Sequence, residues 1–335
     1  MIKEYQKGMI LVFALWVLIL LSIFSLYLGR GARQKALFVK RLGERDVLHL
    51  IALAGVNKAI LAISKDDSSR IDSFLDVWAS KKEEFKDIKI GLGRFNVFYN
   101  YPQDGTIRTM FGVVDEARKI NINKVDMKII ERLFEIVLNV SESEAKEFAA
   151  SIIDFRDKDS NLLIPQGSAE DSYYRNLSEP YDCKDDDYES LDELLLVKGI
   201  TFDIFNKIKD FITIYGDKAV NINTASEEVL SAIGITDTVI DKIVTYRKGE
   251  DSELGTEDDN IFVSSTSVVP SLSQHYSLSI SEVQNLSNIV AKGFIGVSSD
   301  YFSINSEASL SYSKAKEIIE CIVSREGNIL FWREQ

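Results

Sequence analysis

The stretch Met9–Leu28 in this 335-residue chain contains no charged side chain. A helix of that length rises about 30 Å, which is the thickness of the hydrocarbon core of a bilayer. Most of its residues are Leu, Ile, Val or Phe, and together they favour insertion by about 4–8 kcal/mol. We therefore predict a transmembrane helix over residues 9–28. A secretory signal cut near Gly31 is the main alternative, although its apolar region would span only about 7–15 residues.

The same helix is expected to continue beyond the membrane, through residues 29–64. Apolar side chains recur there at helical spacing, while charged side chains and His49 take the other side. The predicted apolar face consists of Val47, Leu50, Ile51, Ala54 and Ile60/Leu61. Three glycines, at positions 29, 31 and 43, could bend the helix, and the polar segment 64–70 should end it.

Strand-like alternation appears on both sides of a long helical region. Residues 94–101 and 107–113 alternate around a turn at 102–105, and three further strands are expected near 301–305, 315–323 and 329–332. We predict an α+β fold in which the long helix packs on a small antiparallel sheet. Residues 65–123 and 294–335 would form this part, and residues 124–293 would form a large all-α domain inserted between its strands.

An Ile-Asn motif recurs before helical segments, at 119–123 (KININ) and 220–225 (VNINTA), with a looser copy at 302–308 (FSINSEA). The Asn, Thr and Ser side chains can cap helix N-termini. The second copy resembles helix-hairpin-helix modules of DNA-uptake proteins, with the hairpin at Gly234–Asp237. A net charge of −13 disfavours this interpretation, because phosphate binding needs a basic surface. We predict no nucleic-acid partner.

Carboxylates are concentrated in the segment from Asp154 to Asp187, which contains ten acidic residues when both ends are counted. Hard cations such as Ca²⁺ bind six to eight oxygens, often from closely spaced carboxylates. Asp157, Asp159 and Asn161 match the first ligand positions of an EF-hand, but the required Gly and the final Glu are missing. Taken alone, this acidic run favours a solvated loop. The same holds for a second acidic loop, at residues 249–260.

The sequence provides no support for catalysis. It contains two histidines, His49 and His275, and none of the common nucleophile, zinc or phosphate-binding motifs. We therefore expect no enzymatic activity. Cys183 and Cys321 lie far apart in sequence. A disulfide between them is chemically possible in an oxidising compartment, but their spacing does not establish one.

The residues before the apolar helix form a short polar leader, 1–8, that ends in Lys7-Gly8. This leader resembles those of type IV pilins and pseudopilins. The resemblance implies that prepilin peptidase cleaves between Gly8 and Met9, followed by methylation. It also implies a single-pass helix in the bacterial inner membrane, with the bulk of the chain in the periplasm. The basic residues that follow the span weakly favour the opposite orientation, and we give the cleavage motif more weight.

A series of central motifs resembles the K-type minor pseudopilin of type II secretion, the general secretion protein K family. These motifs are Asp154–Asp159, Gly167–Tyr174, Pro180-Tyr181 and Leu191–Ile200. Phe13 fits as well, because this family lacks the Glu that pilins usually carry at the fifth mature position. Two departures are an apparent insertion at Ser168 and an Asp-rich segment after Tyr181.

The resemblance implies a pilin-like fold and a structural role at the tip of the periplasmic pseudopilus, together with other minor pseudopilins. It also implies a Ca²⁺ site in the central loop, with ligands drawn from Asp157, Asp159, Glu170 and Asp171. The leading alternative is a membrane-tethered DNA-uptake receptor with helix-hairpin-helix domains. A generic membrane-anchored adhesin is a third interpretation.

Overall fold

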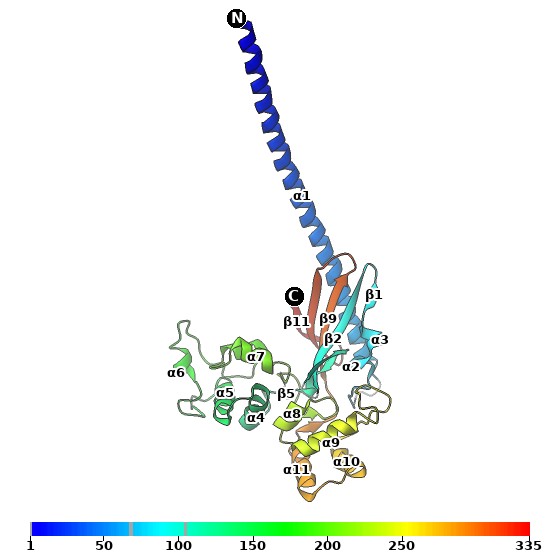
Figure 1. Cartoon of the computed structure of the whole chain (residues 1–335). Coiled ribbons are helices and arrows are strands. Elements are labelled where there is room, and N and C mark those ends of the chain that lie inside the picture. Colours follow the sequence, from blue (N-terminus) through cyan, green and yellow to red (C-terminus); the bar gives the residue numbers. More distant parts are fainter. Residues whose placement is uncertain (1, 67–69, 104–105) are drawn as a thin grey trace.

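The computed structural model describes residues 2–66, 70–103 and 106–335, and it consists of a long stalk and a compact body (Figure 1). The stalk is α1 (Ile2–Ser64), which runs without interruption through Gly29, Gly31 and Gly43. Met1 of the predicted leader lies outside the described residues. Of the helices in the described part of the chain, α1 alone is long and apolar enough to cross a membrane.

The body is built on a seven-stranded sheet in which every strand pairing is antiparallel. The strand order is β1-β2-β9-β10-β11, with β3 paired to β2 and β4 paired to β9. The strands are β1 (Ile88–Ile90), β2 (Gly93–Gln103), β3 (Thr106–Phe111), β4 (Val114–Asp115), β9 (Tyr301–Leu310), β10 (Lys316–Ser324) and β11 (Ile329–Glu334). The predicted α+β class and the predicted hairpin are confirmed, while turn residues 104–105 lie outside the described part.

The C-terminal half of α1 lies against the sheet because its contact face carries small residues. Gly55 and Ala59 let the helix approach closely, and the Ser306 hydroxyl donates to the Ala52 carbonyl at 2.8 Å. The buried face consists of Leu48, Ile51, Ala52, Val56, Ala59 and Ile63.

The predicted apolar face of α1 was therefore wrong in part. Val47, Leu50 and Leu61 are exposed. Apolar residues surround nearly the whole helix here, so two neighbouring faces fit the helical period equally well. The sheet contacts the face with the smaller side chains. Two short helices, α2 (Val77–Ser80) and α3 (Lys82–Phe85), also pack on this core, and the Trp78 ring makes an edge-on contact with Phe302 at 5.0 Å.

The inserted region lies between β4 and β9 and is mainly helical. Its first part contains η1 (Glu116–Arg118), α4 (Met127–Leu138), α5 (Glu142–Asp154), α6 (Asp171–Tyr174), η2 (Leu191–Leu196) and α7 (Phe202–Ile208). Its second part contains α8 (Glu227–Ala232), α9 (Asp237–Arg247), η3 (Ser265–Ser267), α10 (Val268–His275) and α11 (Ile280–Ala291).

The expectation of an all-α insertion was not fully correct, because two short parallel strand pairs close its two parts. β5 (Ile120–Asn121) pairs with β6 (Ile212–Thr213), and β7 (Val220–Asn221) pairs with β8 (Ile295–Gly296). The first strand of each pair comes from an Ile-Asn motif. The third proposed copy, at 302–308, is instead part of β9, where every second side chain is buried in the core of the main sheet.

The two Ile-Asn motifs make equivalent hydrogen bonds, which identifies the insertion as a tandem structural repeat. In the first, the Asn123 side chain donates to the Tyr188 carbonyl and accepts from the Tyr188 amide, each at 2.9 Å. In the second, Asn223 makes the same pair with Phe262, at 3.0 and 2.8 Å.

An arginine in each part, Arg156 partly buried and Arg247 buried, makes a second set of equivalent hydrogen bonds. Arg156 donates to the carbonyls of Ile122 and Val125. Arg247 donates to the carbonyls of Ile222 and Ala225. We refer to residues 119–213 as the first repeat and residues 220–296 as the second repeat.

A buried polar network joins the second repeat to the body, and we call it the junction. Asp72 is fully buried and accepts two hydrogen bonds from Arg325, at 2.6 and 2.7 Å, as well as one from the Ser299 amide at 2.5 Å. The Asn221 side-chain amide donates to the Asp72 carbonyl at 3.1 Å and to Asp115 Oδ2 at 2.8 Å. Burial raises the pKa of the Asp115 carboxyl, whereas its hydrogen bonds from Thr224, Asn221 and the Arg118 amide act in the opposite direction.

Candidate functional site

Three of the four predicted metal ligands lie together in the loop that follows α5. Asp157, Asp159 and Glu170 each offer a carboxylate oxygen, and these oxygens lie within 4.8 Å of one another. Glu170 is 4% exposed. Its Oε2 accepts from the Cys183 thiol at 3.7 Å, and its Oε1 is buried without a hydrogen-bond partner among the described residues.

The loop is held in place by its own polar groups. Asp157 accepts from the Asp159 amide at 3.3 Å, and Asp159 accepts from the Asn161 amide at 2.7 Å. The Lys198 ammonium donates to the Gly167 carbonyl at 2.9 Å. The two aspartates lie close to Glu170, which directly precedes α6.

The electrostatics of this cluster disfavour the ionised form of its carboxyl groups. Burial, followed by the negative charges of Asp154 and Asp157, raises the pKa of Glu170 to about 7. Burial also raises the pKa of Asp157. A carboxylate that is buried without a partner is costly, whereas three hard oxygen donors suit Ca²⁺. The buried, unpaired oxygen of Glu170 and the all-oxygen donor set thus fit the expected ion.

Asp171 does not belong to this cluster. One of its oxygens accepts from the Cys183 amide at 2.8 Å, and the other pairs with Arg175 at 2.7 Å. Glu170 caps α6 and Asp171 begins it, so the two neighbouring side chains diverge. Asp154 is a neighbour that the ligand prediction did not include. It is fully buried and accepts from the Leu163 amide, which fixes the loop.

The second acidic loop occupies the equivalent place in the second repeat, between Arg247 and Phe262. Several of its carboxylates already have partners. Asp258 accepts from the amides of Glu250 and Asp251, and Asp259 accepts from the Gly255 amide at 2.7 Å. These bonds lower the pKa of Asp258. The first loop is therefore the better cation site.

The remaining sequence candidates lie apart from the acidic cluster. At the proposed helix hairpin, the Gly234 carbonyl accepts from Asn285 and the Arg132 side chain lies close by. Cys183 and Cys321 are both buried free thiols, in the cores of the insertion and the sheet, so they do not form a disulfide.

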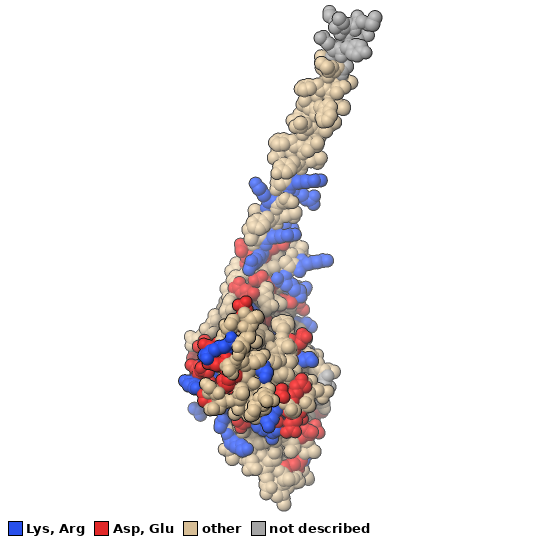
Figure 2. Space-filling model, turned by 90° about the vertical axis from the view of Figure 1, so that its left-hand side faces the viewer, with Lys and Arg blue, Asp and Glu red and all other residues tan. Residues whose placement is uncertain are grey.

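Figure 2 shows basic side chains along α1 below its apolar end and acidic side chains over the body.

Comparisons with known proteins agree with the motifs. Residues 93–217 match the family model of the Type II secretion system (T2SS), protein K. Over 93 residues the chain is 36% identical to the type II secretion system protein K of Aeromonas hydrophila, and this match covers 27% of the chain and 28% of that relative.

The fold is also shared with a solved structure. A chain in the crystal structure of the GspK-GspI-GspJ complex from the enterotoxigenic Escherichia coli type 2 secretion system superposes with a TM-score of 0.61 and 14% identity. The alignment covers 91% of this chain and 99% of that one. Residues 93–217 therefore resemble the protein K domain of type II secretion systems, in agreement with the central motifs, and the solved structure shows that the fold of the chain is shared.

Proposed function

We propose that this protein is a minor pseudopilin of type II secretion. It would be anchored in the bacterial inner membrane by α1, with its body in the periplasm. The observation that carries this proposal is the protein K domain set on a pilin-like core, in which one long helix is apolar at its exposed end and packed on a sheet at the other. The role is structural, and we propose no enzymatic activity.

The position in the filament follows from the bulk of the insertion and from Phe13. The first repeat lies to the side of the sheet, and the second repeat lies beyond the end of the sheet that is opposite to the projecting part of α1 (Figure 1). Such bulk does not fit a close helical stack at every repeat. Phe13 cannot neutralise the N-terminal ammonium of a neighbouring subunit, and a buried charge without a partner costs several kcal/mol. Both features favour a single copy at the tip, in contact with other minor pseudopilins.

The acidic cluster supports a structural cation. Ca²⁺ would be held by Asp157, Asp159 and Glu170. It would neutralise their negative charge and give the buried carboxylate of Glu170 a partner. Bound there, the ion would fix the loop between α5 and Tyr188, which forms one surface of the first repeat.

The proposed tip position predicts one labelled copy at the distal end of each pseudopilus. Immunogold labelling of the insertion on pseudopili that have been elongated by overexpression of the major subunit would measure this. Phe13→Glu should leave the end labelling unchanged, because the insertion still prevents internal packing. Regular labelling along the shaft of the wild-type filament would contradict the proposal.

We also predict that prepilin peptidase cleaves between Gly8 and Met9 and leaves α1 in the membrane. Mass spectrometry of the purified full-length protein should then find Met9 as the N-terminal residue. Gly8→Leu should block the cut, because a bulky side chain replaces the residue before the cleaved bond. A mature terminus near Ala32, or retention of Met1 in the wild type, would show that the leader assignment is incorrect.

Calcium should stabilise the full-length protein in detergent micelles. After treatment with EDTA, addition of millimolar Ca²⁺ should raise the Tm, because an ion that binds only the folded state stabilises it. Asp157→Asn should remove most of this rise. Asp182→Asn should retain it, because Asp182 is an exposed carboxylate of the same region that pairs with Arg175 instead. Equal responses in wild type and Asp157→Asn would exclude this site.

The same cluster predicts a pH dependence in EDTA. Glu170 keeps its proton in the folded state up to a pKa of about 7, whereas its ordinary value is 4.5. The unfolded state therefore binds fewer protons between about pH 4.5 and 7, and the contribution of Glu170 to the free energy of unfolding falls as the pH rises. Glu170→Gln should flatten this part of a stability–pH profile, and saturating Ca²⁺ should do the same in the wild type.

A further inference from the structure

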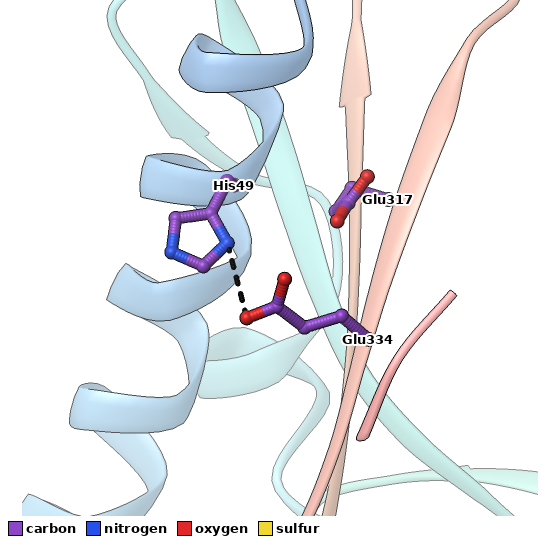
Figure 3. A group of neighbouring side chains, drawn as sticks. All are labelled: His49, Glu317 and Glu334. Atoms are coloured by element: carbon purple, nitrogen blue, oxygen red, sulfur yellow. Dashed lines mark ion pairs between the residues drawn. The ribbon is translucent and has the colours of Figure 1, made fainter. Parts of the chain in front are cut away.

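A second group of potential metal ligands lies where α1 meets the last two strands of the sheet (Figure 3). His49 comes from α1, Glu317 from β10 and Glu334 from β11. One ligand atom from each of the three residues lies within 4.8 Å of the other two. This group is separate from the acidic cluster of the first repeat and is built from a nitrogen donor and two carboxylates.

Glu317 lies on the buried face of β10, where the alternation of the strand would favour an apolar side chain. It lies on the same face of β10 as Ile319, Cys321 and Val323, which are 0–1% exposed and belong to the core beneath α1. Glu317 itself is only 7% exposed. Within the described part of the chain, its carboxylate has no hydrogen-bond or ion-pair partner. A cation bound at this position would offset the cost of burying the carboxylate.

The distance between His49 and Glu334 fits two ligands of one metal ion better than a direct hydrogen bond. His49 Nδ1 and Glu334 Oε1 lie 3.6 Å apart, which is too long for a hydrogen bond. In a tetrahedral zinc site with bonds of about 2.0–2.2 Å, ligand atoms lie about 3.3–3.6 Å apart. The Trp332 indole donates to Glu334 Oε1 at 2.9 Å and so orients this carboxylate, as outer partners commonly do in metal sites.

We propose that His49, Glu317 and Glu334 bind a divalent transition-metal ion of the Zn²⁺ type. Imidazole together with carboxylates is a ligand set that such ions accept, whereas Ca²⁺ prefers oxygen alone. The side chains of His49 and Glu334 are about one-third exposed, which leaves room for water at the fourth position. The ion would fasten the stalk helix to the C-terminal hairpin at the level where α1 leaves the sheet.

The test uses the full-length protein in detergent micelles after removal of metals with EDTA. Titration with Co²⁺ should give visible absorption bands that saturate at one equivalent and disappear when Zn²⁺ is added. His49→Ala and Glu317→Gln should each weaken Co²⁺ binding at least tenfold. His275→Ala is the matched control. This second histidine lies on α10 and contacts Tyr246 and the Ser271 carbonyl, so its loss should leave the titration unchanged.

Stability provides an independent readout. Glu317→Gln removes a buried charge while keeping nearly the same shape, so in EDTA its Tm should equal or exceed that of the wild type. Addition of Zn²⁺ should raise the Tm of the wild type but not of this variant. An equal Zn²⁺ response in both proteins would overturn the proposal. Loss of the Co²⁺ bands in Asp157→Asn, with retention in His49→Ala, would also overturn it, because it would place the ion in the acidic loop.

Discussion

The junction around Asp72 and Arg325 is the interaction on which the arrangement of this protein depends. Asp72 follows α1, Arg325 follows β10, and Asn221 opens the second repeat, so the network draws together three distant parts of the chain. Asp72, Asp115 and Asn221 are buried and the Arg325 side chain is largely so, and these groups offset one another's desolvation. An apolar contact between the same elements would tolerate sliding, whereas charged and amide groups fix one orientation. The second repeat is thereby held to the sheet in one orientation.

The tandem repeats have equivalent internal hydrogen bonds but different roles. In the second repeat, Asn221 directs its side-chain amide to Asp72 and Asp115 in the junction. In the first repeat, the equivalent Asn121 donates to Tyr215 and Gly216, just beyond its own closing strand. The first repeat is thus not anchored in the same way, and it carries the acidic cluster with the unpaired Glu170 oxygen. We interpret the second repeat as the anchor and the first as the exposed surface that a cation would order.

Elements with strong periodicity could be predicted from the sequence. The apolar span, the hairpin and the C-terminal strands each follow from local patterns, and the central motifs resemble the protein K family, whose model matches residues 93–217. The burial of one face of α1 could not be predicted, because Gly55 and Ala59 matter only through their contact with the sheet. The separation of Asp171 from Glu170 could not be predicted either, because it depends on the partners that Asp171 finds in Cys183 and Arg175. The His49, Glu317 and Glu334 group joins residues almost 300 positions apart in sequence, and no local signal reports it.

The central claim, that the junction holds the body and the insertion together, is tested most directly with Arg325→Met. Removal of one partner from a buried pair should cost about 3–5 kcal/mol, whereas Arg333→Met breaks a half-exposed pair with Asp192 and should cost at most about 1 kcal/mol. Hydrogen exchange of the full-length protein in micelles, resolved by peptide mass spectrometry, reports both parts separately. The account predicts that Arg325→Met lowers protection in β9 and β10 and in α8 and α9 together. Unchanged protection in α8 and α9 would show that the second repeat is stable without the junction and would contradict the account.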